Sequence, residues 1–269
     1  MDLSIIIPCY NEEHRLGKTL ERIAEHFQTQ TCTYEVIVVD NGFTDATGQI
    51  VESYKDKIQN IRLISRRSHG KGWAIKEGML SATGRYRLFM DADNATDISH
   101  VADLMEETKE GYDVVISSRR IKGAIIQNPQ SVARQILGRV FAWLVRVIVP
   151  LGIKDTQNGF KLFTEKAVTT IFPHQTIYYW AFDVEVLAIA KALRLKIKEV
   201  PITWVDDEKS TMRLGGMVRM LMEVIWIRIN MSTSTYIKNE RRVGERRSED
   251  RRAERRDQDD RRTSNNRLS

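Results

Sequence analysis

The first 118 residues alternate between short apolar runs and segments with helical periodicity, and this alternation constrains the fold more than any other feature. Residues 3–8 form an almost continuous apolar run, which is typical of a strand covered by helices on both faces. We expect further strands at residues 35–40, 61–65, 86–90 and 114–118, and helices at residues 71–82 and 101–109. This order predicts an α/β fold of Rossmann-like type, with a mostly parallel central sheet, right-handed crossovers and helices on both faces.

Polar residues follow three of the expected strands, at 9–12, 40–45 and 91–93. In an open parallel sheet the carboxyl ends of the strands meet at one edge, and ligands bind there. We therefore expect a binding site along this edge.

Asp91-Ala92-Asp93 comes directly after the expected strand at residues 86–90. Residues two apart in an extended segment point to the same side. Two carboxylates on one side suit Mg²⁺ or Mn²⁺, which keeps coordination positions open for phosphate oxygens. We expect Asp91 and Asp93 to bind such a metal; an ordinary solvated turn is the alternative.

Two other strand ends offer groups to a nucleoside. Asp40 can accept a hydrogen bond from a base or a ribose, although Asp-Asn-Gly turns are common in any protein. Pro8, Tyr10 and Glu12 follow the first strand, where the alternative is a helix capped by Asn11.

Lys71 lies in the segment His-Gly-Lys-Gly, which opens a helix and can present backbone N–H groups and a cation to phosphate. The spacing of a P-loop is missing, and no Gly-x-Gly-x-x-Gly follows the first strand. The sequence therefore disfavours a dinucleotide-dependent enzyme.

Two long segments of the second half, residues 132–149 and 216–231, have apolar residues at helical spacing interrupted by arginines. Each is either a core helix or an amphipathic helix that lies in a membrane interface. Between them, residues 155–161 form a polar loop, and Asp183 and Glu185 are either functional carboxylates or structural hydrogen-bond acceptors.

The net charge of +6 is concentrated at the end of the chain, because residues 238–269 contain 12 basic and 8 acidic residues. This segment is almost devoid of apolar residues, and we expect it to be disordered. The interspersed acids argue against nucleic acid as a partner. We expect a domain at residues 1–237, with halves 1–118 and 119–237, followed by the charged tail at 238–269.

No apolar run reaches the ~20 residues that span a bilayer, and no signal peptide is evident. Two cysteines, Cys9 and Cys32, lack metal or redox spacing. We expect a cytoplasmic protein that is soluble or peripheral on the cytoplasmic face of a membrane.

Seven segments together resemble the inverting glycosyltransferases of family 2, which have the GT-A fold. They are SIIIPCYNEE, EVIVVDNGFTDAT, HGKGWAIKEGM, YRLFMDAD, VVISSRR, DTQNGFKLF and FDVEVLAIAKALRLKIKEVPITW. They occur in the family's order within residues 3–205. The last two look most similar to polyprenyl-phosphate sugar transferases, in particular dolichyl-phosphate β-glucosyltransferases.

The resemblance implies roles for individual residues. Pro8, Tyr10, Glu12 and Asp40 would form the nucleoside pocket. Asp91 would face the ribose and the diphosphate, and Asp93 would ligate the metal. The implied catalytic residues are Arg119 at the acceptor phosphate and Asp155 and Gln157 beside the reacting centre.

The sequence departs from the family pattern at several positions. Asn41 replaces the usual second acid, and Phe43 replaces a small residue. Asn158 stands where the family has cysteine, and Ser210-Thr211 where it often has Ser-Lys, so that Lys209 or Arg213 would have to supply the cation.

The expected function is transfer of a hexose from a nucleotide-sugar to a polyprenyl or dolichyl phosphate at the membrane surface. UDP-glucose is the leading candidate for the donor. An acceptor phosphate is mostly dianionic at neutral pH and hardly needs a base, whereas a sugar hydroxyl would need one. The alternatives are a GDP-mannose-dependent mannosyltransferase and a non-catalytic nucleotide-sugar-binding module.

Overall fold

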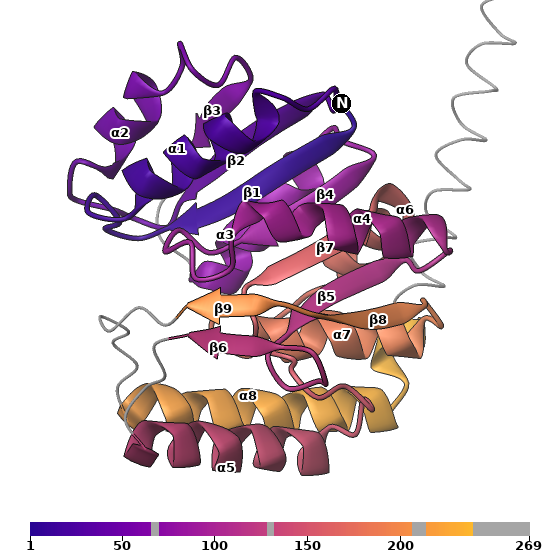
Figure 1. The fold of residues 1–269 in the computed structure, drawn as a ribbon. Coiled ribbons are helices and arrows are strands. Elements are labelled where there is room, and N and C mark those ends of the chain that lie inside the picture. Colours follow the sequence, from indigo (N-terminus) through magenta and orange to yellow (C-terminus); the bar gives the residue numbers. More distant parts are fainter. Residues whose placement is uncertain (66–69, 128–131, 206–213, 239–269) are drawn as a thin grey trace, which may run out of the picture.

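The fold is known from a computed structural model, which describes residues 1–65, 70–127, 132–205 and 214–238. Its main sheet has seven strands in the order β3-β2-β1-β4-β7-β5-β8 (Figure 1). The strands are β1 (Leu3–Cys9), β2 (Tyr34–Asp40), β3 (Ile61–Ile64), β4 (Tyr86–Met90), β5 (Val114–Ser118), β7 (Phe160–Thr164) and β8 (Ile197–Pro201). All five strands expected in the first half are present.

Every strand of this sheet runs parallel to its neighbours except β7, which is antiparallel to both β4 and β5. The prediction of a mostly parallel α/β sheet is therefore confirmed. The antiparallel strand was not predicted, and it inserts between β4 and β5, the two strands that lead into Asp91 and Arg119.

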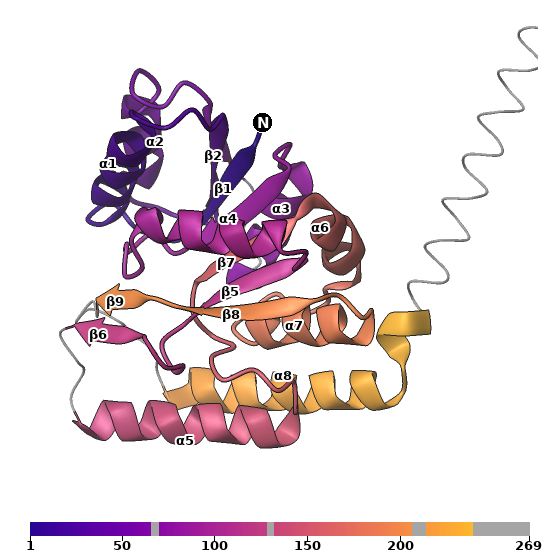
Figure 2. The ribbon, with the colours of Figure 1, turned by 45° about the vertical axis from the view of Figure 1, so that its right-hand side comes forward.

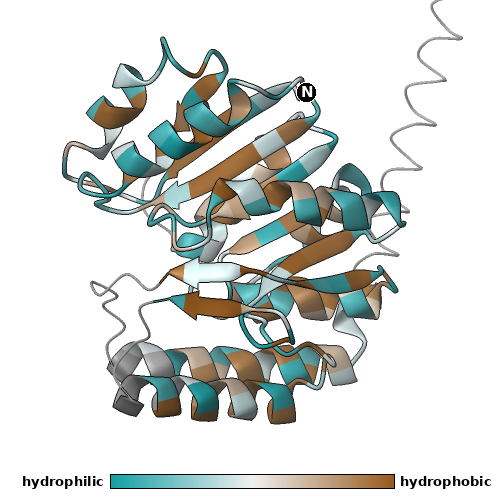
Figure 3. Ribbon diagram, in the orientation of Figure 1, coloured by the Kyte–Doolittle hydropathy of each residue, from teal (hydrophilic) through white to brown (hydrophobic). Residues whose placement is uncertain are grey.

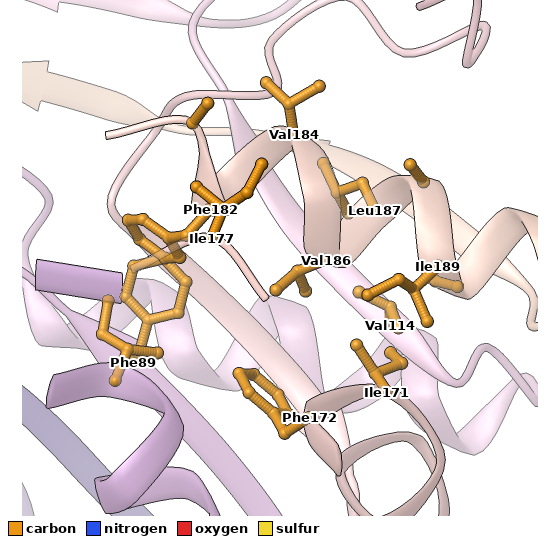
Figure 4. Packing of buried hydrophobic residues seen from close by; sticks show 14 of the residues in the cluster. Phe89, Val114, Ile171, Phe172, Ile177, Phe182, Val184, Val186, Leu187 and Ile189 are labelled. Atoms are coloured by element: carbon orange, nitrogen blue, oxygen red, sulfur yellow. The ribbon is translucent and has the colours of Figure 1, made fainter. Parts of the chain in front are cut away.

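Helices cover both faces of the sheet (Figures 1 and 2). One face packs against α1 (Leu16–Phe27), α2 (Thr47–Ser53) and α4 (Val101–Lys109), which follows the short η1 (Ile98–His100). The other packs against α3 (Lys71–Ser81), α6 (Glu165–Ile171) with η2 (Phe172–His174), and α7 (Phe182–Ala192). Figure 4 shows α7 packing onto the sheet, with Phe182 beside Phe89 of β4.

Helices α5 (Val132–Ile148) and α8 (Leu214–Ser232) lie side by side beyond α7, next to the small parallel sheet of β6 (Ile125–Gln127) and β9 (Thr203–Val205) (Figures 1 and 2). Both helices bury one side in the core, through Phe141 and Val145 of α5 and Val224 and Ile227 of α8. No helix among the described residues is long and apolar enough to cross a membrane. The expected disordered tail lies outside the described residues, apart from Lys238.

The first helix begins later than the sequence suggested. Asn11 has a left-handed backbone (φ 55°), and its Oδ1 accepts a hydrogen bond from the Thr44 N–H instead of capping a helix. Because this bond joins the ends of β1 and β2, α1 starts only at Leu16, without a side-chain cap.

Candidate active site

A polar cleft lies at the carboxyl end of β4, with a volume of about 390 Å³ that includes space open to solvent. Its lining comes from four stretches of chain that the fold brings together: Asp91 to Thr96 after β4, Arg119 after β5, the loop before β7, and Trp204 of β9. The lining residues are Asp91, Asp93, Ala95, Thr96, Arg119, Gln157, Asn158, Gly159 and Trp204. The site residues predicted at residues 91–93, 119 and 157 therefore meet in one place.

Asp91 and Asp93 are close enough to repel each other. Burial raises the pKa of Asp93, the neighbouring Asp91 carboxylate raises it further, and Lys71 and Arg15 only partly offset these effects. Asp93 Oδ1 accepts the Ala95 N–H at 3.0 Å, which orients the side chain. A divalent cation bound by both carboxylates would reduce this electrostatic repulsion.

Gly159 allows the loop before β7 to lie directly against Asp91. The Asp91 N–H donates to Gly159 O at 3.0 Å, and a Cβ on Gly159 would lie 2.0 Å from Asp91 Oδ2. No larger side chain fits here unless the carboxylate moves, so the glycine in this loop is required by close approach.

Lys71 contacts Asp91 from the first turn of α3, with Nζ 2.6 Å from Asp91 Oδ1. Burial lowers the pKa of Lys71, but Asp91 and Asp183 more than offset this, and the pKa is raised. Lys71 is therefore a charged ammonium group at the edge of the cleft, where it can contact phosphate.

Arg119 and Asp155 form a tightly bonded pair. The backbone N–H and Nε of Arg119 donate to Asp155 Oδ2 at 2.9 and 2.8 Å, and Nη2 donates to Oδ1 at 2.9 Å. Burial alone would raise the pKa of Asp155, but Arg119 and Arg120 hold it at about 2. The Arg119 guanidinium also lies over the Trp204 ring, 5.1 Å from its centroid, facing the cleft.

Gln157 links the cleft to α8, because its Nε2 lies 3.5 Å from Met220 Sδ. Two neighbouring backbone groups anchor the same loop, since the N–H groups of Lys154 and Asp155 donate to the Glu199 carboxylate on β8. The loop that carries Asp155 and Gln157 is thereby held by the sheet on one side and touches a long helix on the other.

The expected nucleoside residues lie at the ends of β1 and β2 and do not line the cleft itself. Asp40 accepts hydrogen bonds from the N–H groups of Gly42 and Phe43 and from the hydroxyl of Ser65. These three protein groups occupy most of the hydrogen-bonding positions of its carboxylate. Pro8 is buried in β1, and the Tyr10 ring is 57% exposed at its end.

Glu12 pairs with Arg15, whose Nε lies 2.7 Å from Glu12 Oε2. Burial raises the pKa of Glu12, Arg15 lowers it, and the charges of Asp93 and Asp91 raise it again, so Glu12 is electrostatically coupled to the cleft.

Asp183 and Glu185, the two carboxylates of uncertain role, are both structural acceptors in the first turn of α7. Asp183 accepts a hydrogen bond from the fully buried Lys161 of β7. Glu185 accepts the Thr176 and Ile177 N–H groups and the Thr176 hydroxyl. The alternative of structural hydrogen bonding therefore describes both residues.

Asn41, a departure from the family pattern, has a visible role: its Oδ1 accepts the Gly70 N–H at 2.9 Å and ties β2 to the start of α3. The departures at Ser210 and Thr211, with Lys209 and Arg213, lie outside the described residues.

Five cleft residues were not among the site residues predicted from the sequence: Ala95, Thr96, Asn158, Gly159 and Trp204. Thr96 and Trp204 come together through an isolated antiparallel bridge between distant segments. Nothing in local sequence spacing signals such a contact, whereas the position of Asn158 between Gln157 and Gly159 could have indicated it.

The carboxylates present fit a divalent metal. Within the described residues, no group of three or more His, Cys, Asp or Glu side chains could hold a metal ion by itself. Asp91 and Asp93 would therefore supply two oxygen ligands and leave further positions for phosphate oxygens, as Mg²⁺ prefers.

Comparison with known proteins identifies the family. The model of glycosyl transferase family 2 matches residues 4–172. A dolichyl-phosphate β-glucosyltransferase from Trichomonas vaginalis is 36% identical over 240 residues, which cover 84% of this chain and 73% of the relative. The enzyme of that name from Saccharomyces cerevisiae is 32% identical over 259 residues, covering 89% of this chain and 78% of the relative.

Among solved structures, glucosyl-3-phosphoglycerate synthase from Mycobacterium tuberculosis, in complex with Mn²⁺, UDP and glucosyl-3-phosphoglycerate, has the same fold. Its TM-score is 0.65 at 18% identity, over 86% of this chain and 79% of that chain. Another structure of that enzyme contains Mg²⁺ and UDP. With its GT-A fold and these relatives, the chain is a glycosyltransferase and belongs to glycosyl transferase family 2.

Proposed function

We propose that this chain transfers glucose from UDP-glucose to a polyprenyl phosphate such as dolichyl phosphate, with inversion at the anomeric carbon. The names of its curated relatives support this acceptor and this sugar. The observation that carries the proposal is the state of Asp155, which is ionised, bonded to Arg119 and has a pKa of about 2.

A carboxylate with so low a pKa is a poor general base at neutral pH, because proton acceptors work best with a pKa near the working pH. A hydroxyl acceptor would need such a base. A phosphate monoester has a second pKa of about 6 and attacks as an anion without one. Arg119, held in the cleft by Asp155, is placed to attract that anion, so the site suits an acceptor that is already charged.

On the donor side, Asp91 and Asp93 would hold Mg²⁺ or Mn²⁺ together with the diphosphate. When bound, the metal neutralises charge on the leaving diphosphate as the sugar–phosphate bond breaks. Lys71 would contact the same phosphates, since its ammonium group already lies 2.6 Å from Asp91 Oδ1. Tyr10 and Glu12 would border the nucleoside, next to the carboxyl end of β1.

The lipid acceptor would reach the cleft from a membrane surface. Helices α5 and α8 carry exposed apolar residues at helical spacing, among them Val140 and Val147 of α5 and Met222 and Ile229 of α8, which form an outward apolar face. Figure 3 shows hydrophobic and hydrophilic residues alternating along both helices. Trp143 and Trp226 are 56% and 54% exposed on this face, and the exposed Arg139, Arg146 and Arg228 lie on the same two helices. Tryptophan and arginine together favour the headgroup region. The opposite, inward side of α8 contacts Gln157 through the buried Met220, so this helix connects the outward face to the loop that lines the cleft.

The test is a donor panel. The purified chain is incubated with UDP-glucose or GDP-mannose, Mn²⁺ or Mg²⁺, and a short polyprenyl phosphate, and lipid-linked sugar is measured. We expect glucosyl transfer from UDP-glucose. Asp93→Asn should lower the rate by about 100-fold or more, as does loss of an electrostatic contact to the transition state in other enzymes.

The matched control is Asp56→Asn, an exposed carboxylate far from the cleft in the turn after α2, which should leave the rate unchanged. Mannosyl transfer from GDP-mannose without glucosyl transfer would show that the donor is GDP-mannose and not UDP-glucose. Tight binding of both donors without turnover would contradict the proposed activity.

A further inference from the structure

Unpaired polar atoms gather around the cleft. Among the described residues, two buried side-chain atoms of residues that line the cleft have no partner, Thr96 Oγ1 and Asn158 Nδ2; a third, Asp91 Oδ1, has only the ionic contact with Lys71. Native proteins pair nearly all buried polar groups, so a concentration of unpaired ones in one cleft points to a ligand that completes them.

Thr96 and Asn158 are the two neutral members of this set. They are 5% and 3% exposed, and their backbones are firmly placed. Thr96 forms a bridge with Trp204, and Asn158 O accepts a hydrogen bond from the buried Lys161 Nζ at 2.5 Å. The backbone around both residues is therefore fixed, while the polar ends of the side chains are left without partners.

We propose that Thr96 and Asn158 bind hydroxyl groups of the donor's hexose and thereby help to determine which sugar the enzyme accepts. This rests on the proposed function, since it takes the cleft to be the donor-sugar site. The charged groups of the cleft, Asp91, Asp93 and Arg119, suit a metal and phosphates. A hydroxyl and an amide, which both donate and accept, match the neutral hydroxyls of a sugar.

Both unpaired atoms are buried, so each side chain has to rotate before it can contact the sugar. Rotation about χ1 of a threonine exchanges its hydroxyl with its methyl group, and rotation about χ2 of an asparagine turns its amide; each moves between allowed rotamers. Because the atoms have no bond to lose inside the protein, such a rotation breaks no existing hydrogen bond. No hydrogen bond of these polar atoms therefore opposes a rotation that brings them to a ligand.

The experiment compares donor and nucleotide binding in isosteric variants. Thr96→Val and Asn158→Leu keep side-chain volume and remove the polar atoms. Dissociation constants for UDP and for UDP-glucose are measured by calorimetry with Mn²⁺ and no acceptor, and the melting temperature is measured without ligand. We expect UDP binding to be unchanged and UDP-glucose binding to weaken roughly tenfold, the effect of losing one hydrogen bond.

The control is Thr108→Val, which removes a buried hydroxyl that does have a partner, the Met105 carbonyl of α4 at 2.6 Å. This variant should lower the melting temperature and leave both dissociation constants unchanged. Thr96→Val should not lower the melting temperature, because it deletes an unpaired polar atom.

Three outcomes would overturn the inference. Equal binding of UDP-glucose by both variants and the wild type would show that neither side chain contacts the hexose. Equal losses for UDP and UDP-glucose would place the contacts on the nucleotide or the metal instead. Failure of the wild-type chain to bind either UDP or UDP-glucose would refute the proposed donor itself, and with it the inference that rests on it.

Discussion

Asp155 binds Arg119 through three hydrogen bonds, and this arrangement decides what the carboxylate can do. The sequence indicated the residue but not its role, because the partner lies 36 positions away, after another strand. Once paired, Asp155 is a weak base that holds a cation over Trp204 and toward the cleft. At the scale of single residues, the chemistry therefore shifts from proton abstraction to placement of charge.

The same pair predicts a pH-dependent stability. The folded-state pKa of Asp155 is about 2, below its usual value of 3.8, so its contribution is present above pH ~4 and is lost as the pH falls toward 2. Asp155→Asn should reduce the free energy of unfolding at pH 7 by roughly 2 kcal/mol. Urea denaturation at several pH values measures this, and a difference that does not shrink in acid would contradict the assigned pKa.

At the scale of elements, β7 is the strand that organises the cleft. It lies between β4 and β5 and is preceded by the loop that touches Asp91 and Arg119. Sequence patterning did not identify it, because its second residue, Lys161, is a charge in a position that is fully buried. Only the three-dimensional fold shows why this is tolerated: Asp183 of α7 supplies the opposite charge.

Neither charge of this pair would be stable alone. Burial lowers the pKa of Lys161 and raises that of Asp183, and each partner opposes the shift of the other. Lys161 also donates to Asn158 O, and its ammonium group lies 4.9 Å from the centroid of the Phe89 ring. The pair thus joins α7, β4 and the cleft loop.

We predict that Lys161→Met lowers the free energy of unfolding by about 3–5 kcal/mol, since it leaves Asp183 buried without its partner. The double variant Lys161→Met, Asp183→Leu should recover part of this loss, because both charges are then removed. As a comparison, Lys166→Met breaks the exposed pair with Asp113 and should cost less than about 1 kcal/mol. Urea denaturation compares all three; equal losses for the two lysines would refute the role of burial.

At the scale of the whole molecule, α8 contacts the cleft loop through the buried Met220 and carries exposed apolar residues on its outward side. The sequence left core packing and membrane contact as alternatives for these helices. The structure shows that each helix has both kinds of surface, since Val145 and Val224 are buried while Trp143 and Trp226 are exposed. The helical spacing of apolar residues predicted where the two helices lie. It could not show which of these residues are buried and which are exposed, because both faces of each helix are apolar.

This arrangement predicts binding to lipid vesicles. Replacing Trp143 and Trp226 together by aspartate should weaken co-flotation with vesicles containing anionic lipid by about tenfold or more, because two large apolar side chains are lost from the interface. Leu80→Asp provides the control, since Leu80 is 43% exposed on α3, away from this face. Wild-type protein that remains unbound in the same assay would contradict the membrane contact.

Most of the fold could be predicted from the sequence because buried parallel strands are continuous apolar runs, and polar residues after them mark the binding edge. That reasoning predicted Asp91 and Asp93 at this edge, whereas Arg119 was predicted from the family resemblance; all three line the cleft. It could not find Thr96 or Trp204, whose bridge joins segments more than 100 residues apart. Contacts of this kind depend on tertiary packing rather than on local pattern.

The most direct test of the account compares two acceptors that differ by the phosphate group: a polyprenyl phosphate and the corresponding polyprenol, each with UDP-glucose and Mn²⁺. We predict glucosyl transfer to the phosphate and none to the alcohol, because Asp155 is too weak a base to activate a hydroxyl. Transfer to the alcohol at a comparable rate would contradict the proposed chemistry of the site.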